Sequence, residues 1–404
     1  MRVLAYLLTS SGILPQDEGT TRILFGTWVT NDDDEAHLQV FVRIISKLEK
    51  VSLNTLRTAL PFKWNENEPY DTVNPFGDIR GIDFHALWTF NLDDGILLQT
   101  NRYHRRRIPL SCLRNGLITL ASMEYLGPPV PLRSNPTHSL TTPCWRPQVL
   151  IDKRTREFTH RILRDFDRQW RHILRNSYNA ITLRVLARAL LLLSKLDFDI
   201  YEETKQRHGR RGSHVWITQL PTWRPLEAGI VCFGKVHAVV CHSIQEGISI
   251  VQKHATSLES IATNPYMILS IKHIMLCRAT SPNVFEYTAP ERLFNGNPDT
   301  EPPSTLALDY LIWAVTPSVR PNSTRLHLLP IEIQDNILKY VSAGSVAAAK
   351  IGCLLGVGSV FQWKDGVLNI SLEETWTNRT PWSPVESQLW FSKSEIGLVY
   401  RGRS

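Results

Sequence analysis

Residues 153–175 carry the pattern that most constrains how this chain can fold. Apolar side chains recur there at three- and four-residue steps, and arginines occupy most of the positions between them. This spacing is typical of an amphipathic helix with one apolar face. A second and more apolar run over 180–196 predicts another helix that is more deeply buried. The apolar set of the first helix is Phe158, Ile162, Phe166, Trp170, Ile173 and Leu174, and its basic set is Arg154, Arg161, Arg164, Arg168, Arg171 and Arg175.

Strand patterns lie on both sides of this helical centre. Val3–Leu8 and residues 21–30 are rich in the aliphatic, β-branched and aromatic side chains that strands favour. Residues 86–100 place two apolar runs around Asp93-Asp94-Gly95, and residues 360–372 repeat the arrangement around Asp365-Gly366. Because glycine accepts the positive φ of tight turns, both segments predict β-hairpins. Separate hairpins and helices, without alternating βαβ units, predict the α+β fold class.

An acidic run from Asp32 to Glu35 precedes an apolar pattern at helical spacing. Carboxylates are favoured in the first turn of a helix, so we expect a helix over about 35–50 with this run as its solvated start. A metal cluster is the alternative, but no second acidic cluster of matching spacing is present in the sequence. We therefore expect no metal site and no cofactor.

The chain is expected to divide into several regions. Six prolines between Pro128 and Pro147, among many serines and threonines, indicate a linker or a long surface loop. We expect an acidic α+β region over 1–135, a linker over 136–148, and a basic helical and then α+β region over 149–320. The last region, 324–404, is expected to hold one helix and a β-hairpin tail.

The charge is distributed unevenly along the chain. Residues 1–100 carry 8 basic and 14 acidic side chains, a net charge of −6, whereas residues 101–240 carry 24 and 10, a net charge of +14. A region this basic is suited to nucleic acid, to an acidic partner, or to the acidic first part of the same chain. We expect it to pair at least partly with residues 1–100.

Cysteine usage and hydropathy indicate the compartment. The six cysteines include no CxxC pair, which argues against zinc-ribbon and thioredoxin-type folds. A chain of 404 residues can form its cores without disulfides, so we expect reduced thiols. No window approaches the roughly 18 consecutive apolar residues of a membrane span. The expected location is cytoplasmic or nuclear, with no membrane association.

The most informative short motif lies at residues 329–341, Leu-Pro-Ile-Glu-Ile-Gln-Asp-Asn-Ile-Leu-Lys-Tyr-Val. Pro330 suits a first helical position, where its missing N–H costs nothing. Glu332 then falls in the first turn, where the helix dipole favours negative charge. The pattern predicts a helix with one apolar stripe, made of Ile333, Ile337, Leu338 and Val341.

This segment resembles the opening helix of the F-box, the module by which substrate adaptors of ubiquitin ligases hold the Skp1 linker protein. In that family, the Leu-Pro dipeptide and the aliphatic residues after it pack into a helical groove of the partner. The resemblance implies an adaptor that binds a Skp1-like linker protein and an unknown protein target. The residues that it implies for partner binding are Leu329, Pro330, Glu332, Ile333, Ile337, Leu338 and Val341.

The resemblance covers only this short segment of the chain. An F-box continues into a second helix and a basic, tryptophan-containing segment, whereas here residues 343–356 are helix-compatible and lack the Arg-Trp element. The motif also lies near the C-terminus rather than the N-terminus. With the hairpin that follows, it is similar to proteins of filamentous fungi, a likeness that implies no activity. A working element would expose Leu329, Pro330, Ile333 and Ile337, whereas a core helix would bury them.

Two other functions stay open. The chain could bind nucleic acid through its basic region, with tryptophans as stacking faces, although no RRM, KH, helix-turn-helix or finger signature is present. It could also be an enzyme whose site assembles from distant residues, since no phosphate loop, GxSxG elbow, HExxH helix or Rossmann glycine pattern is present. The arginines singled out for anion or nucleic-acid contact are Arg105, Arg106, Arg107, Arg161, Arg168, Arg210 and Arg211.

Overall fold

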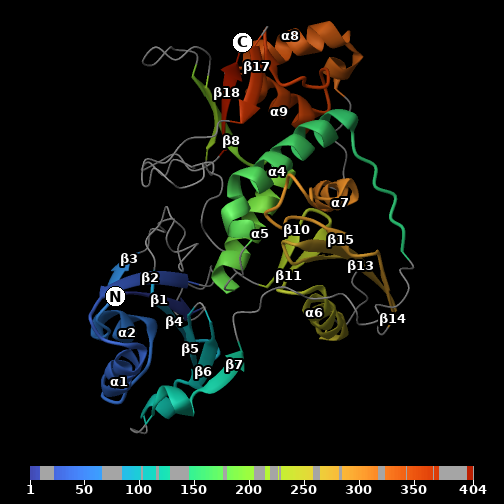
Figure 1. Cartoon of the computed structure of the whole chain (residues 1–404). Coiled ribbons are helices and arrows are strands. Elements are labelled where there is room, and N and C mark those ends of the chain that lie inside the picture. The colour runs from blue at the N-terminus through green and yellow to red at the C-terminus, as the bar shows by residue number, and fades with distance from the viewer. Residues whose placement is uncertain are drawn as a thin grey trace. The chain divides into compact units, whose positions relative to one another are not determined.

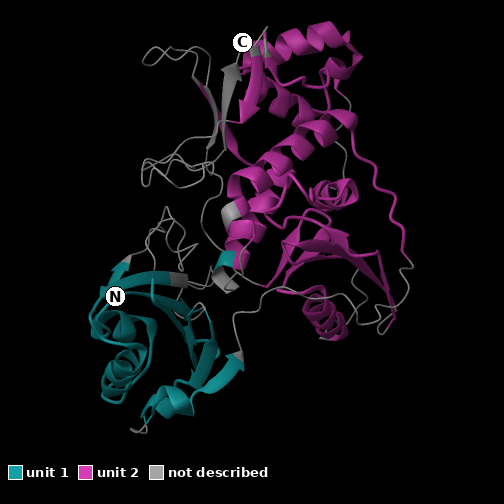
Figure 2. Cartoon of the chain, in the orientation of Figure 1, with its two compact units in different colours: residues 1–133, 177–182 teal, residues 134–176, 183–404 magenta. Residues whose placement is uncertain are grey.

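The chain folds into two compact units, coloured separately in Figure 2. Unit 1 comprises Met1–Arg133 and Ser177–Thr182, and unit 2 comprises Ser134–Asn176 and Leu183–Ser404. Each contains helices and sheets, so the α+β class predicted from the sequence is confirmed. The computed structural model describes residues 1–9, 22–65, 84–101, 103–114, 118–127, 145–175, 180–203, 214–218, 226, 229–257, 264–281, 284–316, 324–342, 344–366, 368–372 and 398–403.

Unit 1 is built on a mixed sheet of seven strands, in the order β3-β2-β1-β4-β5-β6-β7. The central strands β1 and β4 pair in parallel, and the other neighbours pair antiparallel. The helices α1 and α2 lie on one side of this sheet (Figure 1). The elements are β1 (Arg2–Thr9), β2 (Arg22–Val29), α1 (Asp34–Ile45), α2 (Leu53–Ala59), β3 (Lys63–Asn65), β4 (Ala86–Asn91), β5 (Ile96–Thr100), β6 (Arg105–Pro109), η1 (Cys112–Arg114), η2 (Leu120–Ser122) and β7 (Glu124–Gly127).

The core of unit 1 forms where α1 covers the sheet. Phe41 of α1 lies with its ring centroid 5.1 Å from that of Trp88 and 5.3 Å from that of Phe90, both on β4. The acidic run starts α1 as predicted, because the Asp33 side chain caps the helix by accepting a hydrogen bond from the Ala36 N–H at 2.8 Å. A cap and an apolar inner face therefore fix α1 on the sheet.

Unit 2 contains a helical centre and a second mixed sheet; only the first residues of its helix α5, up to Thr182, are assigned to unit 1. In this sheet the order is β10-β11-β12-β13-β14, with β15 pairing to β13. The parallel pair β11 and β12 is connected through α6. The elements are α4 (Lys153–Leu174), α5 (Ala180–Lys195), β10 (Ile230–Phe233), β11 (Val236–Val240), α6 (Ile244–Ser257), β12 (Tyr266–Leu269), β13 (His273–Ser281), β14 (Val284–Tyr287), β15 (Glu291–Arg292) and α7 (Thr305–Val315).

A third sheet of unit 2 joins segments that are distant in sequence. Its order is β16-β17-β18-β9-β8, so the C-terminal strand β18 pairs with β9 and brings residues 324–404 into the same unit as 149–320. Three helical segments precede this tail. The elements are β8 (Asp199–Glu203), β9 (His214–Thr218), η3 (Arg325–Leu328), α8 (Ile331–Val341), α9 (Ser345–Leu355), β16 (Lys364–Asp365), β17 (Leu368–Leu372) and β18 (Leu398–Arg403).

Most elements expected from local patterns are present. Both hairpins form, with Gly95 and Gly366 at positive φ in their turns. Arg105–Arg107, singled out from the sequence only for anion contact, form the strand β6 between β5 and β7. Most of the expected linker 136–148 lies outside the described residues.

Candidate functional site

The Leu-Pro segment begins α8 of unit 2. Pro330 is the N-cap residue, and its carbonyl accepts hydrogen bonds from the N–H groups of Ile333 and Gln334, at 3.0 and 3.1 Å. The helix thus begins at Ile331, one residue after the position predicted for its start. Glu332 is exposed in the first turn, where the N-terminal dipole favours a carboxylate.

The inner side of α8 is held by hydrogen bonds and by one apolar contact. Gln334 donates to the Leu329 carbonyl at 2.8 Å and accepts from the Gly358 N–H at 2.7 Å. Leu338, which is 4% exposed, packs with Ala348 and Val357. Nearby residues approach so closely that a Cβ at Gly358 would lie 2.7 Å from the Leu338 Cδ1 atom. The inner side of α8 therefore faces the body of unit 2.

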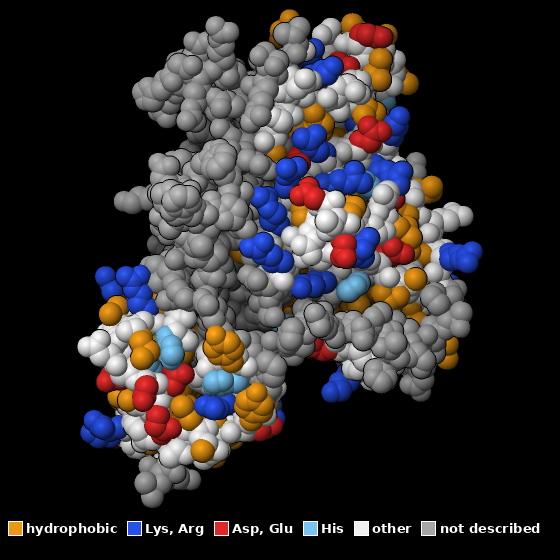
Figure 3. All heavy atoms as spheres, viewed as in Figure 1, with side chains coloured by type: hydrophobic (Ala, Val, Ile, Leu, Met, Phe, Trp, Pro, Cys, Tyr) orange, Lys and Arg blue, Asp and Glu red, His pale blue; other side chains and the backbone are white. Residues whose placement is uncertain are grey.

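The outer side of α8 is apolar and faces solvent. Ile333 is 45% exposed, Tyr340 is 90% exposed, and Ile337 is half-buried. Since each helical residue turns by about 100°, residues 333, 337 and 340 lie within one narrow arc. Figure 3 shows hydrophobic side chains over the part of the molecule where Figure 1 places α8. We name this surface the α8 apolar face, made of Leu329, Pro330, Ile333, Ile337, Tyr340 and Val341.

One predicted partner-binding residue is wrongly placed by the sequence pattern. Leu338 was expected in the same stripe as Ile333 and Ile337, but it belongs to the buried inner side. The physical reason is that Leu338 follows Ile337 by one residue and so points about 100° away from it. Leu338 holds the helix in place and is not accessible to a partner.

The structure adds exposed leucines that the sequence analysis missed. Leu328 at the end of η3 is exposed, as are Leu354 and Leu355 at the end of α9. These ends meet, because His327 Nε2 lies 3.1 Å from the Leu355 carbonyl oxygen. In the sequence, the pairs Leu328-Leu329 and Leu354-Leu355 were the signal that could have identified these residues. They extend the apolar surface beside the beginning of α8.

The companion helix α9 is anchored to the rest of unit 2. The Glu202 carboxylate on β8 accepts a hydrogen bond from the Ala347 N–H at 2.8 Å and so caps the first turn of α9. Lys350 donates to the Phe198 carbonyl, and burial lowers the pKa of its ammonium group. At the other end, burial raises the pKa of the Cys353 thiol to about 12, so this thiol is neutral at physiological pH. These contacts make α9 a fixed support for α8.

The arginines of unit 1 predicted for anion contact lie on β6. Arg107 is paired with Glu124 of β7 through two hydrogen bonds, Nε to Oε2 at 2.6 Å and NH2 to Oε1 at 3.0 Å. This bidentate pair raises the pKa of the Arg107 guanidinium and lowers that of the Glu124 carboxyl. Arg105 and Arg106 are partly buried in the sheet. This strand therefore offers less positive charge to a ligand than its sequence indicates.

The arginines of unit 2 predicted for the same role differ in their surroundings. Arg161 donates to Asp165 at 2.7 Å and stacks over the Trp363 ring, 5.2 Å from its centroid, whereas Arg168 is exposed. Arg210 and Arg211 lie outside the described residues. Arg156 pairs with Asp309 of α7 at 2.6 Å. Both pairs lie within unit 2, and pairing of the basic region with the acidic residues 1–100 stays a prediction.

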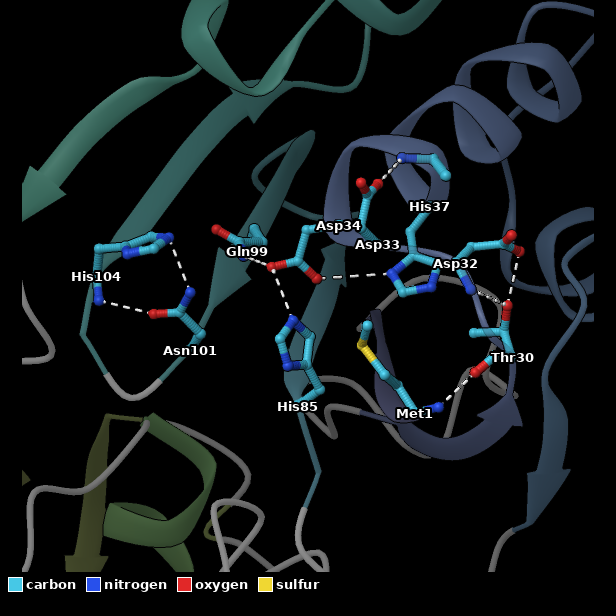
Figure 4. A network of polar contacts seen from close by, with 11 residues as sticks. Met1, Thr30, Asp32, Asp33, Asp34, His37, His85, Gln99, Asn101 and His104 are labelled. Atoms are coloured by element: carbon cyan, nitrogen blue, oxygen red, sulfur yellow. Dashed lines mark hydrogen bonds and ion pairs between the residues drawn. The ribbon is translucent and has the colours of Figure 1, made fainter.

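Unit 1 also holds a polar network around Asp34 at the start of α1, drawn in Figure 4. Gln99 Nε2 donates to Asp34 Oδ2 at 2.8 Å, and His85 Nε2 lies 3.8 Å from the same oxygen. The buried His37 ring places Nδ1 3.6 Å from Asp34 Oδ1. The network joins α1 to β5 and to the residue that directly precedes β4. Within the described part of the chain, no three His, Cys, Asp or Glu side chains form a group that could hold a metal ion.

Neither hydropathy nor similarity assigns a role to the chain. Within the described ranges, no single helix is long and apolar enough to cross a membrane, although α8 and α9 pass that test together as a pair bent by 119°. Comparisons with protein-family models, with curated proteins and with solved structures find no match. The α8 apolar face is therefore interpreted from its own geometry.

Proposed function

We propose that this chain is a protein-interaction protein that holds a Skp1-like linker protein through the α8 apolar face, as an F-box-like substrate adaptor of a ubiquitin ligase. The observation that carries the proposal is the division of α8 into two sides. Its inner side is fixed by Gln334 and Leu338, and its outer side presents Ile333, Ile337 and Tyr340 to solvent. A helix that only completed a core would bury its largest aliphatic side chains.

Helix-in-groove recognition requires this arrangement. Such helices present apolar anchors at i, i+4 and i+7, which are the positions of Ile333, Ile337 and Tyr340. Full burial of one large aliphatic or aromatic side chain stabilises a complex by roughly 1.5–3 kcal/mol, before the cost of association is counted. The anchors are presented by a helix that is already folded and supported by α9, so little conformational entropy is lost on binding. The rest of the chain would recognise the protein target.

The test compares two isoleucines of α8. Ile331 is 48% exposed and Ile333 is 45% exposed, but two helical residues differ by about 200° in direction, so Ile331 lies outside the α8 apolar face. Ile333→Glu and Ile331→Glu place the same charge in the same first turn. Calorimetry with a purified Skp1-like linker protein should show binding by the unmodified chain. We expect Ile333→Glu to weaken this binding by about 30-fold or more, as truncation of an interface anchor does.

The control variant Ile331→Glu should bind within about twofold of the unmodified chain, since a surface change away from the contact has little effect. Equal weakening by both variants would place the contact elsewhere on α8. Failure of the unmodified full chain to bind the linker protein at all would refute the adaptor proposal.

A further inference from the structure

A buried acid of α4 lies against a surface turn of unit 2. Asp167 is 0% exposed, and the backbone of Gly296, in the turn at residues 295–301, lies close enough to influence its carboxyl. We propose that this turn is a pH-sensitive latch on α4, held closed while the Asp167 carboxyl is protonated and loosened when the carboxyl can ionise in water. The inference is independent of the adaptor function, because it concerns another helix and needs no partner protein.

The surroundings of Asp167 favour its neutral form. Among the residues that the structure describes, none donates a hydrogen bond of normal geometry to either carboxyl oxygen. An enclosed carboxylate without donors loses the hydration that stabilises its charge, whereas the neutral acid loses much less. Burial therefore raises the pKa of this carboxyl from 3.8 to about 7, an effect that the Gly296 backbone opposes and the like charge of Asp299 increases.

The turn covers α4 by close backbone contact at Gly296. Gly296 is buried, and its φ of +74° is one that glycine adopts without strain. A Cβ at this position would lie 2.5 Å from the Arg171 carbonyl oxygen and 2.4 Å from the Arg175 backbone nitrogen. Just before the turn, the Phe294 ring contacts that of Phe166, with centroids 6.3 Å apart. Movement of the turn away from α4 would therefore admit water to this side of the helix.

The connection between β15 and α7, residues 293–304, is anchored at both ends (Figure 1). Near its start the Phe294 N–H donates to the Ile271 carbonyl at 3.0 Å, and at its end the Ser304 N–H donates to the Arg292 carbonyl at 2.9 Å. Between these anchors, the backbone hydrogen bonds of the described turn join residues no more than four positions apart. Such local bonds depend on the contact with α4, so the turn can open while β15 and α7 stay in place.

The charged groups around Asp167 do not hold its ionised form in the closed turn. Asp299 is exposed on the turn and repels a second carboxylate. None of the cations within the described ranges donates a hydrogen bond to Asp167. Ionisation is therefore favoured by the water that the open turn admits. The other charged or titratable groups of α4 and of the elements that support the turn are Arg164, Arg171, Lys272, His273, Glu301 and Asp309.

Opening of the turn is coupled to the release of one proton. In the closed turn the Asp167 carboxyl has a pKa of about 7, and in the open turn it regains the ordinary value near 3.8. The equilibrium constant for opening should thus rise by about tenfold for each pH unit between these two values, and should level off above about pH 7. The latch is tightest in acid and responds over the range below neutral pH.

The experiment measures hydrogen exchange of the full chain by mass spectrometry at about pH 5, 6, 7 and 8, with rates corrected for the intrinsic pH dependence of exchange. Peptides that cover the turn report the amides of Thr300 and Glu301, which donate to the Asn297 carbonyl at 3.2 and 2.8 Å. The variant D167N removes the titrating group. The control D197N removes an exposed acid that follows α5. Melting temperatures show whether both variants are folded.

We expect the corrected protection of the turn in the unmodified chain to fall by about 100-fold between pH 5 and 7, and by less than about threefold from pH 7 to 8. In D167N it should change by less than about threefold over the whole range, whereas D197N should behave as the unmodified chain. D299N should level off at a lower pH, because it removes the like charge that raises the pKa of Asp167. This variant provides the comparison if D167N does not fold.

Three results would overturn the proposal. The first is protection of the turn that does not depend on pH in the unmodified chain. The second is the same pH dependence in D167N and D197N, which would assign the titration to another group. The third is an equal loss of protection in all peptides of unit 2, which would indicate global unfolding in place of a local latch. Ile333→Glu should leave the pH dependence unchanged, so failure of either proposal does not affect the other.

Discussion

Replacing Leu338 by alanine should detach α8 from unit 2. The Leu338 side chain is 4% exposed and lies against Ala348 and Val357. Its neighbours are small and the backbone at Gly352 and Gly358 already approaches closely, so little material can move into the cavity that alanine would leave. Leucine-to-alanine changes at buried sites cost about 2–5 kcal/mol. We expect about 3 kcal/mol here, because this apolar cluster is small and contributes few other contacts.

The matched change is Ile333→Ala on the outer side of the same helix. Ile333 is 45% exposed, so its truncation gives up little buried surface, and alanine has a higher helix propensity than isoleucine. The two effects oppose each other, and the free energy of local unfolding should change by less than about 0.5 kcal/mol. Two aliphatic truncations five residues apart should thus differ about sixfold or more in their effect on stability.

Hydrogen exchange measured by mass spectrometry resolves this difference locally. Peptides that cover α8 and α9 report the opening of these helices, independently of the unfolding of the rest of the chain. A loss of about 3 kcal/mol should accelerate exchange about 150-fold in the Leu338→Ala variant. If Ile333→Ala accelerated exchange as much as Leu338→Ala does, the outer side would be packed in solution, and the division of α8 into two sides would be refuted.

Three further changes test other parts of unit 2. Burial raises the pKa of the Asp167 carboxyl from 3.8 to about 7, because the folded protein favours the neutral form of this group. The stability that this preference contributes is fully present below pH 3.8 and is lost as the pH rises to about 7, since the unfolded chain gains by ionising first. Asp167→Asn should therefore be more stable than the unmodified chain at pH 8, by up to about 4 kcal/mol in denaturant titrations, and a pH-independent difference would contradict this. Asp309→Asn should destabilise the contact between α4 and α7 by about 2–4 kcal/mol, because it disrupts the partly buried bidentate pair with Arg156. An unchanged melting temperature would show that this pair contributes nothing to stability. Gly358→Ala should cost about 2–3 kcal/mol of stability, because φ is +82° there and the new Cβ would lie 2.7 Å from Leu338 Cδ1. Gly366→Ala should cost about 1 kcal/mol, because φ is +59° but the surrounding space is open. Equal shifts in melting temperature for the two variants would refute this reasoning.

The sequence predicted correctly those helices and turns that depend on residues close to one another in the chain. The acidic run before α1 caps it through Asp33, and Gly95 and Gly366 take the positive φ that their turns require. Such signals are readable because the interacting groups lie within four residues of one another. The arginines of β6 carry no such local signal, because pairing with β5 and β7 is what makes this basic run a strand.

The candidate site was predictable only in part. The motif at residues 329–341 located α8 with its start misplaced by one residue, and it named Ile333 and Ile337 as partner-binding residues. It did not separate them from Leu338, and it gave no weight to Tyr340. Apolar residues of α8 point in several directions around the helix, so periodicity alone assigns no single apolar side.

The amino-acid sequence by itself determined where the helices and hairpins of this protein begin, because caps, turn glycines and apolar periods act between near neighbours in the chain. For α8, only the tertiary structure decided which side meets solvent. Ala348 and Val357 cover Leu338, and Glu202 on a distant strand caps α9 beneath α8. The contact between Glu202 and the Ala347 N–H joins residues that are 145 positions apart in the sequence. Burial is a property of such long-range contacts, so an exposed apolar face and a buried one look alike until the chain has folded.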